Sequence, residues 1–182
     1  MAQDQHITIN NFRRVNSWLF RGGQPQADEF EQLAKIGIVT IISFRWNGKV
    51  IAQERQKAQE YNFNLFSIPL SYWVLPTRKE IERFFTIIDD ASKRPIFVHC
   101  LHGSDRTGMF VAIYRMAREG WTADAAYTEM KEAGFHRFRM HQFKWAVYGF
   151  ARRLEREQRT RILANQQEES QDIKINLQKD AG

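Results

Sequence analysis

The residues of this chain that are best suited to chemistry lie between positions 97 and 108, in the sequence FVHCLHGSDRTG. Cys100 is the one cysteine among the 182 residues, and Arg106 follows it by six positions. A cysteine thiolate is a strong nucleophile, and a guanidinium can hold two phosphate oxygens at once. These residue types at this spacing predict a phosphate-binding loop that brings a thiolate and a guanidinium together.

The segments on either side of Cys100 indicate how this loop is held. The run 95–99 (PIFVH) predicts a buried strand, and the apolar periodicity after Gly103 predicts a helix. A loop between a strand and the first turn of a helix gathers backbone N–H groups around one point, which suits an anion. Gly103 and Gly108 permit a tight path. The positive end of the helix favours the thiolate form of the cysteine.

Strand-like and helix-like segments alternate along the chain. Strands are predicted at 18–21, 38–44, 64–68 and 95–99, and helices at 27–36, 50–61, 77–88, 103–120, 122–133 and 143–154. This order predicts an α/β fold: a single domain with a central, mostly parallel sheet flanked by helices. We expect residues 1–158 to form that domain and residues 159–182 to form a polar, mobile C-terminal tail.

The loop resembles the signature of the cysteine-dependent phosphatase superfamily, H-C-x5-R-[ST], at every fixed position. The resemblance implies a protein tyrosine phosphatase-like fold and a phosphocysteine intermediate on Cys100. It implies that Arg106 binds the phosphoryl group, that Thr107 assists departure of the thiolate, and that His99 orders the loop. The phosphate-binding residues that it implies are Leu101, His102, Gly103, Ser104, Asp105 and Arg106. The segments 18–25, 41–45 and 120–130 are similar to those of bacterial atypical dual-specificity phosphatases.

The resemblance implies a hydrolase of phosphoric monoesters, first of all a protein tyrosine or dual-specificity phosphatase that needs no metal or organic cofactor. Its substrate is then a phosphorylated protein or another phosphomonoester. Two other substrate classes stay open, namely the 5′-triphosphate of RNA and a phosphoinositide or inositol polyphosphate. His102 and Gly103 match the loop of metazoan RNA 5′-triphosphatases. A pseudophosphatase that binds phosphate as an adaptor without turnover is the non-enzyme alternative.

A general acid is missing from the place where related tyrosine phosphatases carry it. Those relatives supply an Asp from a loop about 30 residues before the cysteine, but here the segment 67–77 contains neither Asp nor Glu. Asp105 is the remaining carboxylate next to the loop arginine. Myotubularin-type and Sac-type lipid phosphatases carry an Asp at this position and use it as the acid. We therefore hypothesise that Asp105 is the general acid, with pairing to an Arg or exposure to water as the alternative.

Composition limits the partners. The formal net charge is +6, and 18 of the 27 basic residues are Arg, which favours anionic partners such as phosphates, RNA or an anionic surface. No basic–aromatic stripe of the RNA-binding kind is present. No apolar run reaches the length of a transmembrane segment, and the N-terminus lacks an apolar signal region. We expect a cytoplasmic protein, or a periplasmic or secreted one if a signal was removed.

A few other side chains have two interpretations. Arg45, at the end of the strand 38–44, either reaches the phosphate crevice or is an exposed surface arginine. Tyr72 and Trp73 either wall the pocket or pack at the domain edge. His136 and His141 have no Cys or carboxylate at metal-ligand spacing, so no metal site is predicted.

Overall fold

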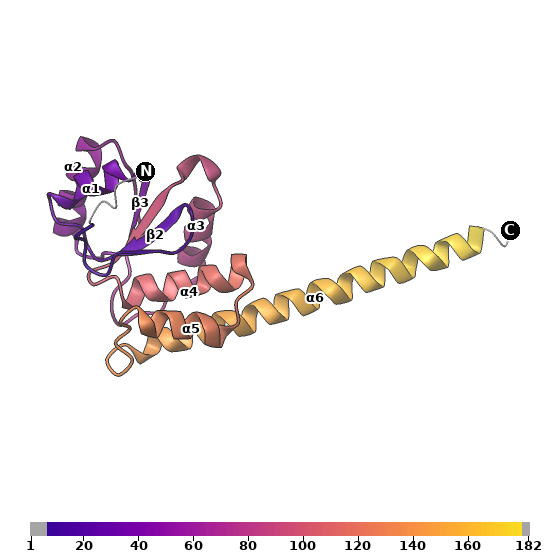
Figure 1. Cartoon of the computed structure of the whole chain (residues 1–182). Coiled ribbons are helices and arrows are strands. Elements are labelled where there is room, and N and C mark those ends of the chain that lie inside the picture. The colour runs from indigo at the N-terminus through magenta and orange to yellow at the C-terminus, as the bar shows by residue number, and fades with distance from the viewer. Residues whose placement is uncertain (1–6, 180–182) are drawn as a thin grey trace.

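Five strands form one sheet in the order β1-β2-β5-β3-β4. The strands are β1 (Arg13–Arg14), β2 (Leu19–Gly22), β3 (Thr40–Ser43), β4 (Asn64–Ser67) and β5 (Ile96–His99) in the computed structural model, which describes residues 7–179. Strand β1 pairs antiparallel with β2, and the pairings β2–β5, β5–β3 and β3–β4 are parallel. The predicted α/β fold with a mostly parallel sheet is confirmed (Figure 1).

The helices follow the predicted order with small changes at their ends, except that η1 was not predicted and α6 continues far beyond its predicted end. They are α1 (Glu29–Lys35), α2 (Gly48–Glu60), α3 (Arg78–Ile88), the 3-10 helix η1 (Ala91–Lys93), α4 (Asp105–Glu119), α5 (Ala123–Glu132) and α6 (His141–Lys179). A capping box begins α3, since the Thr77 N–H donates to Glu80 Oε2 at 2.5 Å. Gly120 ends α4 in the left-handed conformation, with φ +69°, which a glycine adopts at little cost.

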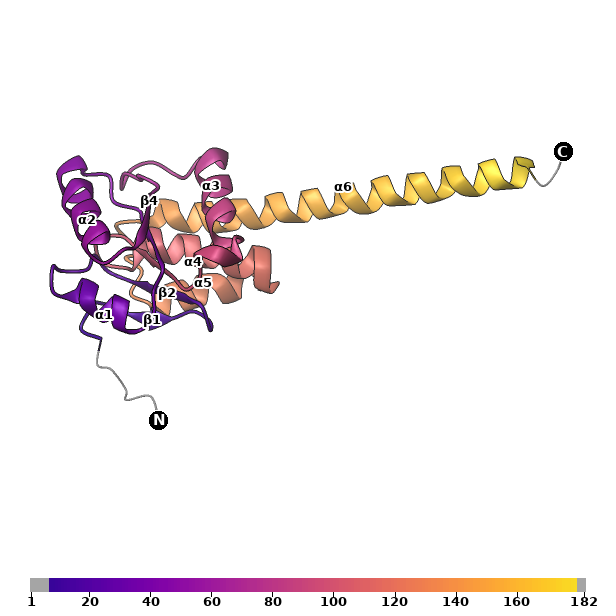
Figure 2. The ribbon, with the colours of Figure 1, turned by 90° about the horizontal axis from the view of Figure 1, so that it is seen from above.

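Two hydrophobic layers cover the two faces of the sheet. Successive residues of a strand point to opposite faces, so Phe97 packs with Phe30 and Leu33 of α1, whereas Val98 packs with residues of α3, α4 and α6 such as Phe110. The sheet therefore lies between α1 and α2 on one side and α3 to α6 on the other (Figures 1 and 2). This arrangement leaves the carboxyl ends of β2, β3 and β5 together at one edge.

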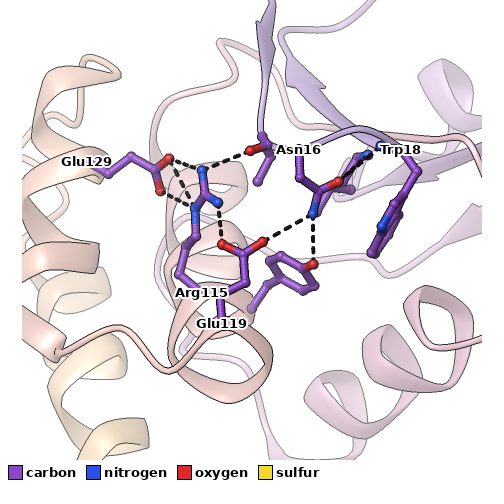
Figure 3. Close-up of polar contacts among 8 residues, drawn as sticks. Asn16, Trp18, Arg115, Glu119 and Glu129 are labelled. Atoms are coloured by element: carbon purple, nitrogen blue, oxygen red, sulfur yellow. Dashed lines mark hydrogen bonds and ion pairs between the residues drawn. The ribbon is translucent and has the colours of Figure 1, made fainter.

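A polar network fixes the far end of α4, the helix that begins at the predicted phosphate loop. The Arg115 guanidinium lies between the carboxylates of Glu119 and Glu129, and its Nη2 also donates to the Val15 carbonyl at 3.1 Å (Figure 3). Asn16 joins the network by donating to Glu119 Oε1 at 3.1 Å. These contacts tie α4 to α5 and to the segment before β2, so the helix carrying the loop is held at both ends.

The C-terminal part of the chain is helical farther than the sequence suggested. Helix α6 continues to Lys179 and leaves the domain (Figure 2), where the sequence predicted a fraying helix from about residue 156. Local hydrogen bonds accompany this continuation, including Thr160 Oγ1 to the Arg156 carbonyl at 2.9 Å. The tail's mobility and its boundary at residue 158 stay predictions. Across residues 7–179, none of the helices combines the length and apolar character of a membrane span.

Candidate active site

The strand–loop–helix unit holds Cys100 and Arg106 at the carboxyl edge of the sheet. Strand β5 ends at His99, and α4 begins at Asp105. Ser43 of β3 and Gly22 of β2 are the register partners of His99, and the Phe44 N–H donates to the His99 carbonyl at 2.9 Å. The loop therefore emerges between two parallel neighbours, as expected of ligand sites in α/β folds.

The Arg106 guanidinium is held by hydrogen bonds at one nitrogen and, within the described part of the chain, has donors without partners at the other two. Its side chain is fully buried, and Nη1 donates to the carbonyls of Phe44 at 3.0 Å and Leu70 at 2.9 Å. Among the described residues, Nε and Nη2 are buried without a hydrogen-bond partner. These two atoms form one edge of the guanidinium fork, the edge that can bind two phosphate oxygens. Because a buried donor without a partner is costly, this edge is suited to receive an anion.

Cys100 is only 2% exposed, although a nucleophile that substrate can reach was expected. The aromatic ring of Tyr72 lies over the Arg106 guanidinium, 4.1 Å from Cζ to the ring centroid. Tyr72 therefore belongs to the wall of the site, whereas its neighbour Trp73 is 81% exposed. Both reactive groups are nearly closed off from solvent in this structure.

A buried carboxylate that the sequence did not reveal holds His99. The Nε2 atom of His99 contacts Oε1 of Glu54, and Nδ1 lies 3.2 Å from the Cys100 carbonyl. Ser43 Oγ donates to Glu54 Oε2 at 2.8 Å. His99 is therefore buried and contacts the loop at the Cys100 carbonyl, so it is placed to order the loop, the role that the resemblance implies.

The ionised state of Glu54 matters for stability. Burial alone would raise the pKa of Glu54, but His99, together with hydrogen bonds from His99 and Ser43, holds that pKa below its ordinary value of 4.5. The unfolded chain therefore binds this proton at higher pH than the folded chain does. The stabilisation is complete above about pH 4.5 and is lost as the pH falls through the lower folded pKa.

Glu54→Gln is therefore expected to lower the free energy of unfolding at pH 7 by about 3 kcal/mol, since it leaves one partner of a buried pair behind. Its unfolding free energy should also fall less than that of the wild type between about pH 5 and about pH 3, because the stabilisation from this carboxylate is lost below its ordinary pKa. Urea unfolding at both pH values measures the two effects. Glu60→Gln, at the exposed end of the same helix, is the matched control. An unchanged acid slope in the Glu54 variant would contradict this role.

The turn of the loop is built on a close backbone approach. Gly103 has φ +75°, and a Cβ there would lie 2.4 Å from the carbonyl carbon of Gly22, so only glycine fits. Arg21, which is buried, donates from Nη2 to the Gly103 carbonyl at 2.6 Å. Burial lowers the pKa of Arg21 to about 10, which leaves it charged at neutral pH. The sequence drew attention to the segment 18–25 but assigned Arg21 no role.

The other predicted loop residues differ in exposure. Leu101 and His102 are exposed, whereas Ser104 and Thr107 are buried. The Ser104 hydroxyl accepts from Asn11 Nδ2 at 3.4 Å. Thr107 Oγ1 is buried and has no hydrogen-bond partner among the described residues. An unengaged hydroxyl at this point can donate to a thiolate, the role that the resemblance implies.

Asp105 pairs with a histidine rather than with an arginine or water. Its carboxylate accepts the backbone N–H of His136 at 2.9 Å and lies 3.0 Å from Nδ1 of that residue. The Asp105 side chain is 4% exposed and the His136 side chain 50%. The ring of His136 also lies edge-on to that of His102, with centroids 6.0 Å apart. Sequence spacing could not reveal this pair, because 31 positions separate its members.

Arg45 lies beside the loop, at the wall of a separate cavity. Its Nε is buried without a hydrogen-bond partner among the described residues. The described part of the chain contains no group of three or more His, Cys, Asp or Glu side chains arranged to hold a metal ion.

Comparison with known proteins extends these observations. The chain is 26% identical over 125 residues to the dual specificity protein phosphatase TpbA of Pseudomonas aeruginosa, covering 69% of this chain and 55% of TpbA. It is 25% identical over 130 residues to the inositol diphosphatase DSP2 of Oryza sativa subsp. japonica, covering 65% and 59% respectively. The chain thus spans little more than half the length of these curated relatives.

Solved structures agree with the fold. The crystal structure of TpbA superposes with a TM-score of 0.67 at 26% identity, over 77% of this chain and 84% of that chain. A second TpbA structure, in complex with pTyr, gives a TM-score of 0.66 at 24% identity, over 76% and 83%. The family model described as "DSP-PTPase phosphatase fused to NAD+ Kinase" matches residues 4–146. Because that match covers most of the chain, this protein belongs to the DSP-PTPase phosphatase family.

Proposed function

We propose that this chain is a cysteine-dependent phosphoric monoester hydrolase that acts on phosphorylated proteins as a tyrosine or dual-specificity phosphatase. The observation that carries the proposal is the free edge of Arg106, whose Nε and Nη2 are buried without a partner among the described residues. It lies in the same loop as Cys100, directly before the body of a helix whose positive end favours anions. The similarity to TpbA supports the same activity.

The reaction has two steps. In the first, the Cys100 thiolate attacks phosphorus, an S–P bond forms, the bond between phosphorus and the leaving oxygen breaks, and that oxygen takes a proton. In the second, water attacks phosphorus, the S–P bond breaks, and phosphate leaves with the thiolate restored. Arg106 and the loop N–H groups stabilise the charge that develops on the phosphoryl oxygens. The Thr107 hydroxyl donates to the departing thiolate.

The proton for the leaving group comes, in this proposal, from Asp105 acting through His136. The Asp105 carboxylate is buried, so it has little access to substrate itself. The His136 ring is half exposed, lies beside His102 of the loop and faces Asp105 with Nδ1. In this proposal the Asp105 carboxylate orients the His136 ring, whose exposed edge passes the proton to the leaving oxygen.

Asp105→Asn and His136→Gln are each expected to lower kcat for an alkyl phosphate by about 10²-fold. Both should flatten the alkaline limb of the pH–rate profile, because a general acid is active only while protonated. Hydrolysis of p-nitrophenyl phosphate, which has a good leaving group, should fall far less. Asp28→Asn, on the exposed surface, is the control. An unchanged pH–rate profile in the Asp105 variant would remove this residue from the acid role.

The other substrate classes are separated by a phosphate-release assay. The panel contains phosphotyrosine and phosphoserine peptides, a phosphoinositide, an inositol pyrophosphate and RNA with a 5′-triphosphate end. The proposal expects the highest kcat/KM for a phosphopeptide. A higher value for the inositol pyrophosphate would favour the activity named for the rice relative, and a higher value for RNA would favour a triphosphatase. Binding of phosphopeptide without any release of phosphate would indicate an adaptor.

A further inference from the structure

A cavity of about 510 Å³ lies beside the phosphate loop, between the segment before α1 and helix α2. Its polar lining residues are Gln24, Gln26, Arg45, Gln53, Glu54, Gln56, Lys57 and Glu60, and apolar side chains complete the wall. The volume is within the range of small ligand sites, and a mixture of apolar surface and a few polar groups is typical of such sites.

Two buried polar atoms in this wall have no partner among the described residues. One is Nε of Arg45, a donor, and the other is Oε1 of Gln24, an acceptor. Buried polar atoms without partners are uncommon and call for an explanation, such as a ligand that completes their hydrogen bonds. A ligand that satisfies both atoms carries an oxygen acceptor with negative charge and a nearby N–H or O–H donor.

Of the two cations in the lining, Lys57 and Arg45, only Lys57 is held in an ion pair by a described carboxylate. The Lys57 ammonium is paired with Glu60 at 2.7 Å. The Glu54 carboxylate is engaged by His99 and Ser43. Arg45 contributes to the lowered pKa of Glu54 but forms no ion pair with a described carboxylate, so its guanidinium can pair with a ligand. Lys57 and Arg45 balance the charges of Glu54 and Glu60, so the lining is neutral as a whole. A neutral lining suits a ligand with one carboxylate better than one with several phosphates.

The cavity adjoins the catalytic loop through two backbone contacts. The Gln24 N–H donates to the Leu101 carbonyl at 3.1 Å. Arg45 directly follows Phe44, whose carbonyl accepts from Arg106 at 3.0 Å. A substrate held at Arg106 can therefore extend a neighbouring group toward Arg45.

We propose that this cavity binds the carboxylate side chain of an Asp or Glu next to the phosphorylated residue of a protein substrate. Arg45 holds the carboxylate, and Gln24 accepts a hydrogen bond from a peptide N–H of the same segment. The inference rests on the proposed protein phosphatase function and specifies which phosphopeptides the site prefers.

The test uses one phosphotyrosine peptide in versions that carry Glu or Gln at each position near the phosphorylated residue. For the wild-type chain, one position should show a preference for Glu over Gln of about tenfold in kcat/KM, the size of one hydrogen bond to a charged group. Arg45→Gln should bring this ratio close to one, and Arg45→Glu should favour a Lys version over the Glu version. Arg55→Gln, an exposed residue of α2 outside the lining, should keep the wild-type ratio.

The outcomes distinguish a failure of the cavity assignment from a failure of the proposed protein phosphatase function. If no phosphopeptide is hydrolysed, the protein phosphatase function itself fails. If phosphopeptides are hydrolysed but no position prefers Glu, or if the preference survives in folded Arg45→Gln and Arg45→Glu proteins, the assignment of the cavity is overturned. Far-UV circular dichroism verifies that the variants are folded. Faster hydrolysis of a polyphosphorylated small molecule that depends on Arg45 would also overturn it.

Discussion

Cys100→Ser is expected to abolish phosphatase turnover while leaving the phosphate-binding loop intact. A serine hydroxyl at this position is a far weaker nucleophile than a cysteine sulfur, whereas the rest of the loop and the start of α4 are unchanged by the substitution. Loss of an essential nucleophile should lower kcat on the order of 10⁴-fold or more.

Phosphate release from a phosphotyrosine peptide measures this loss, and mass spectrometry of acid-quenched wild-type reactions should detect phosphate on Cys100. The variant should still bind inorganic phosphate, because Arg106 and the loop N–H groups remain. An increase of Tm with added phosphate in both proteins reports that binding. Residual turnover near the wild-type rate would show that the sulfur is not the nucleophile.

Arg106→Lys is expected to lower kcat/KM by about 10³-fold, because a lysine ammonium cannot present two parallel donors to a phosphoryl group. Arg106 also serves the fold: its Nη1 binds the carbonyls of Phe44 and Leu70, and its guanidinium lies against the ring of Tyr72. The lysine side chain is shorter and ends in a single ammonium group, so it should leave one of these carbonyls without a donor. The Tm should therefore fall as well.

The two effects are separable by measuring kcat/KM well below the Tm of the variant. Arg83→Lys, on the exposed face of α3, is the matched control and should change neither quantity. If the Arg106 variant lost stability but retained wild-type kcat/KM, the free edge of this guanidinium would not be the phosphate site, and the central observation for the proposed function would be lost.

The local pattern of apolar residues along the sequence was sufficient to predict most of the strands and helices. The apolar runs 38–44 and 95–99 predicted buried strands, and the structure contains β3 and β5 at these places, with α3 inside the predicted helix 77–88. Strand β1 was missed, because two exposed arginines carry no period that could mark a strand. The length of α6 was also missed, because its later residues are polar on all sides and a helix without an apolar face leaves no periodic signal.

The sequence determined the chemistry of the loop, because Cys100, Arg106 and the glycine between them act through residues that are adjacent in the chain. Tertiary structure decided what surrounds them. Glu54 meets His99 across 45 positions, and Arg21 reaches Gly103 across 82. The physical reason is that the spacing of apolar residues shows which face of a helix or strand is buried. A contact between buried polar groups depends instead on how separate helices and strands pack together.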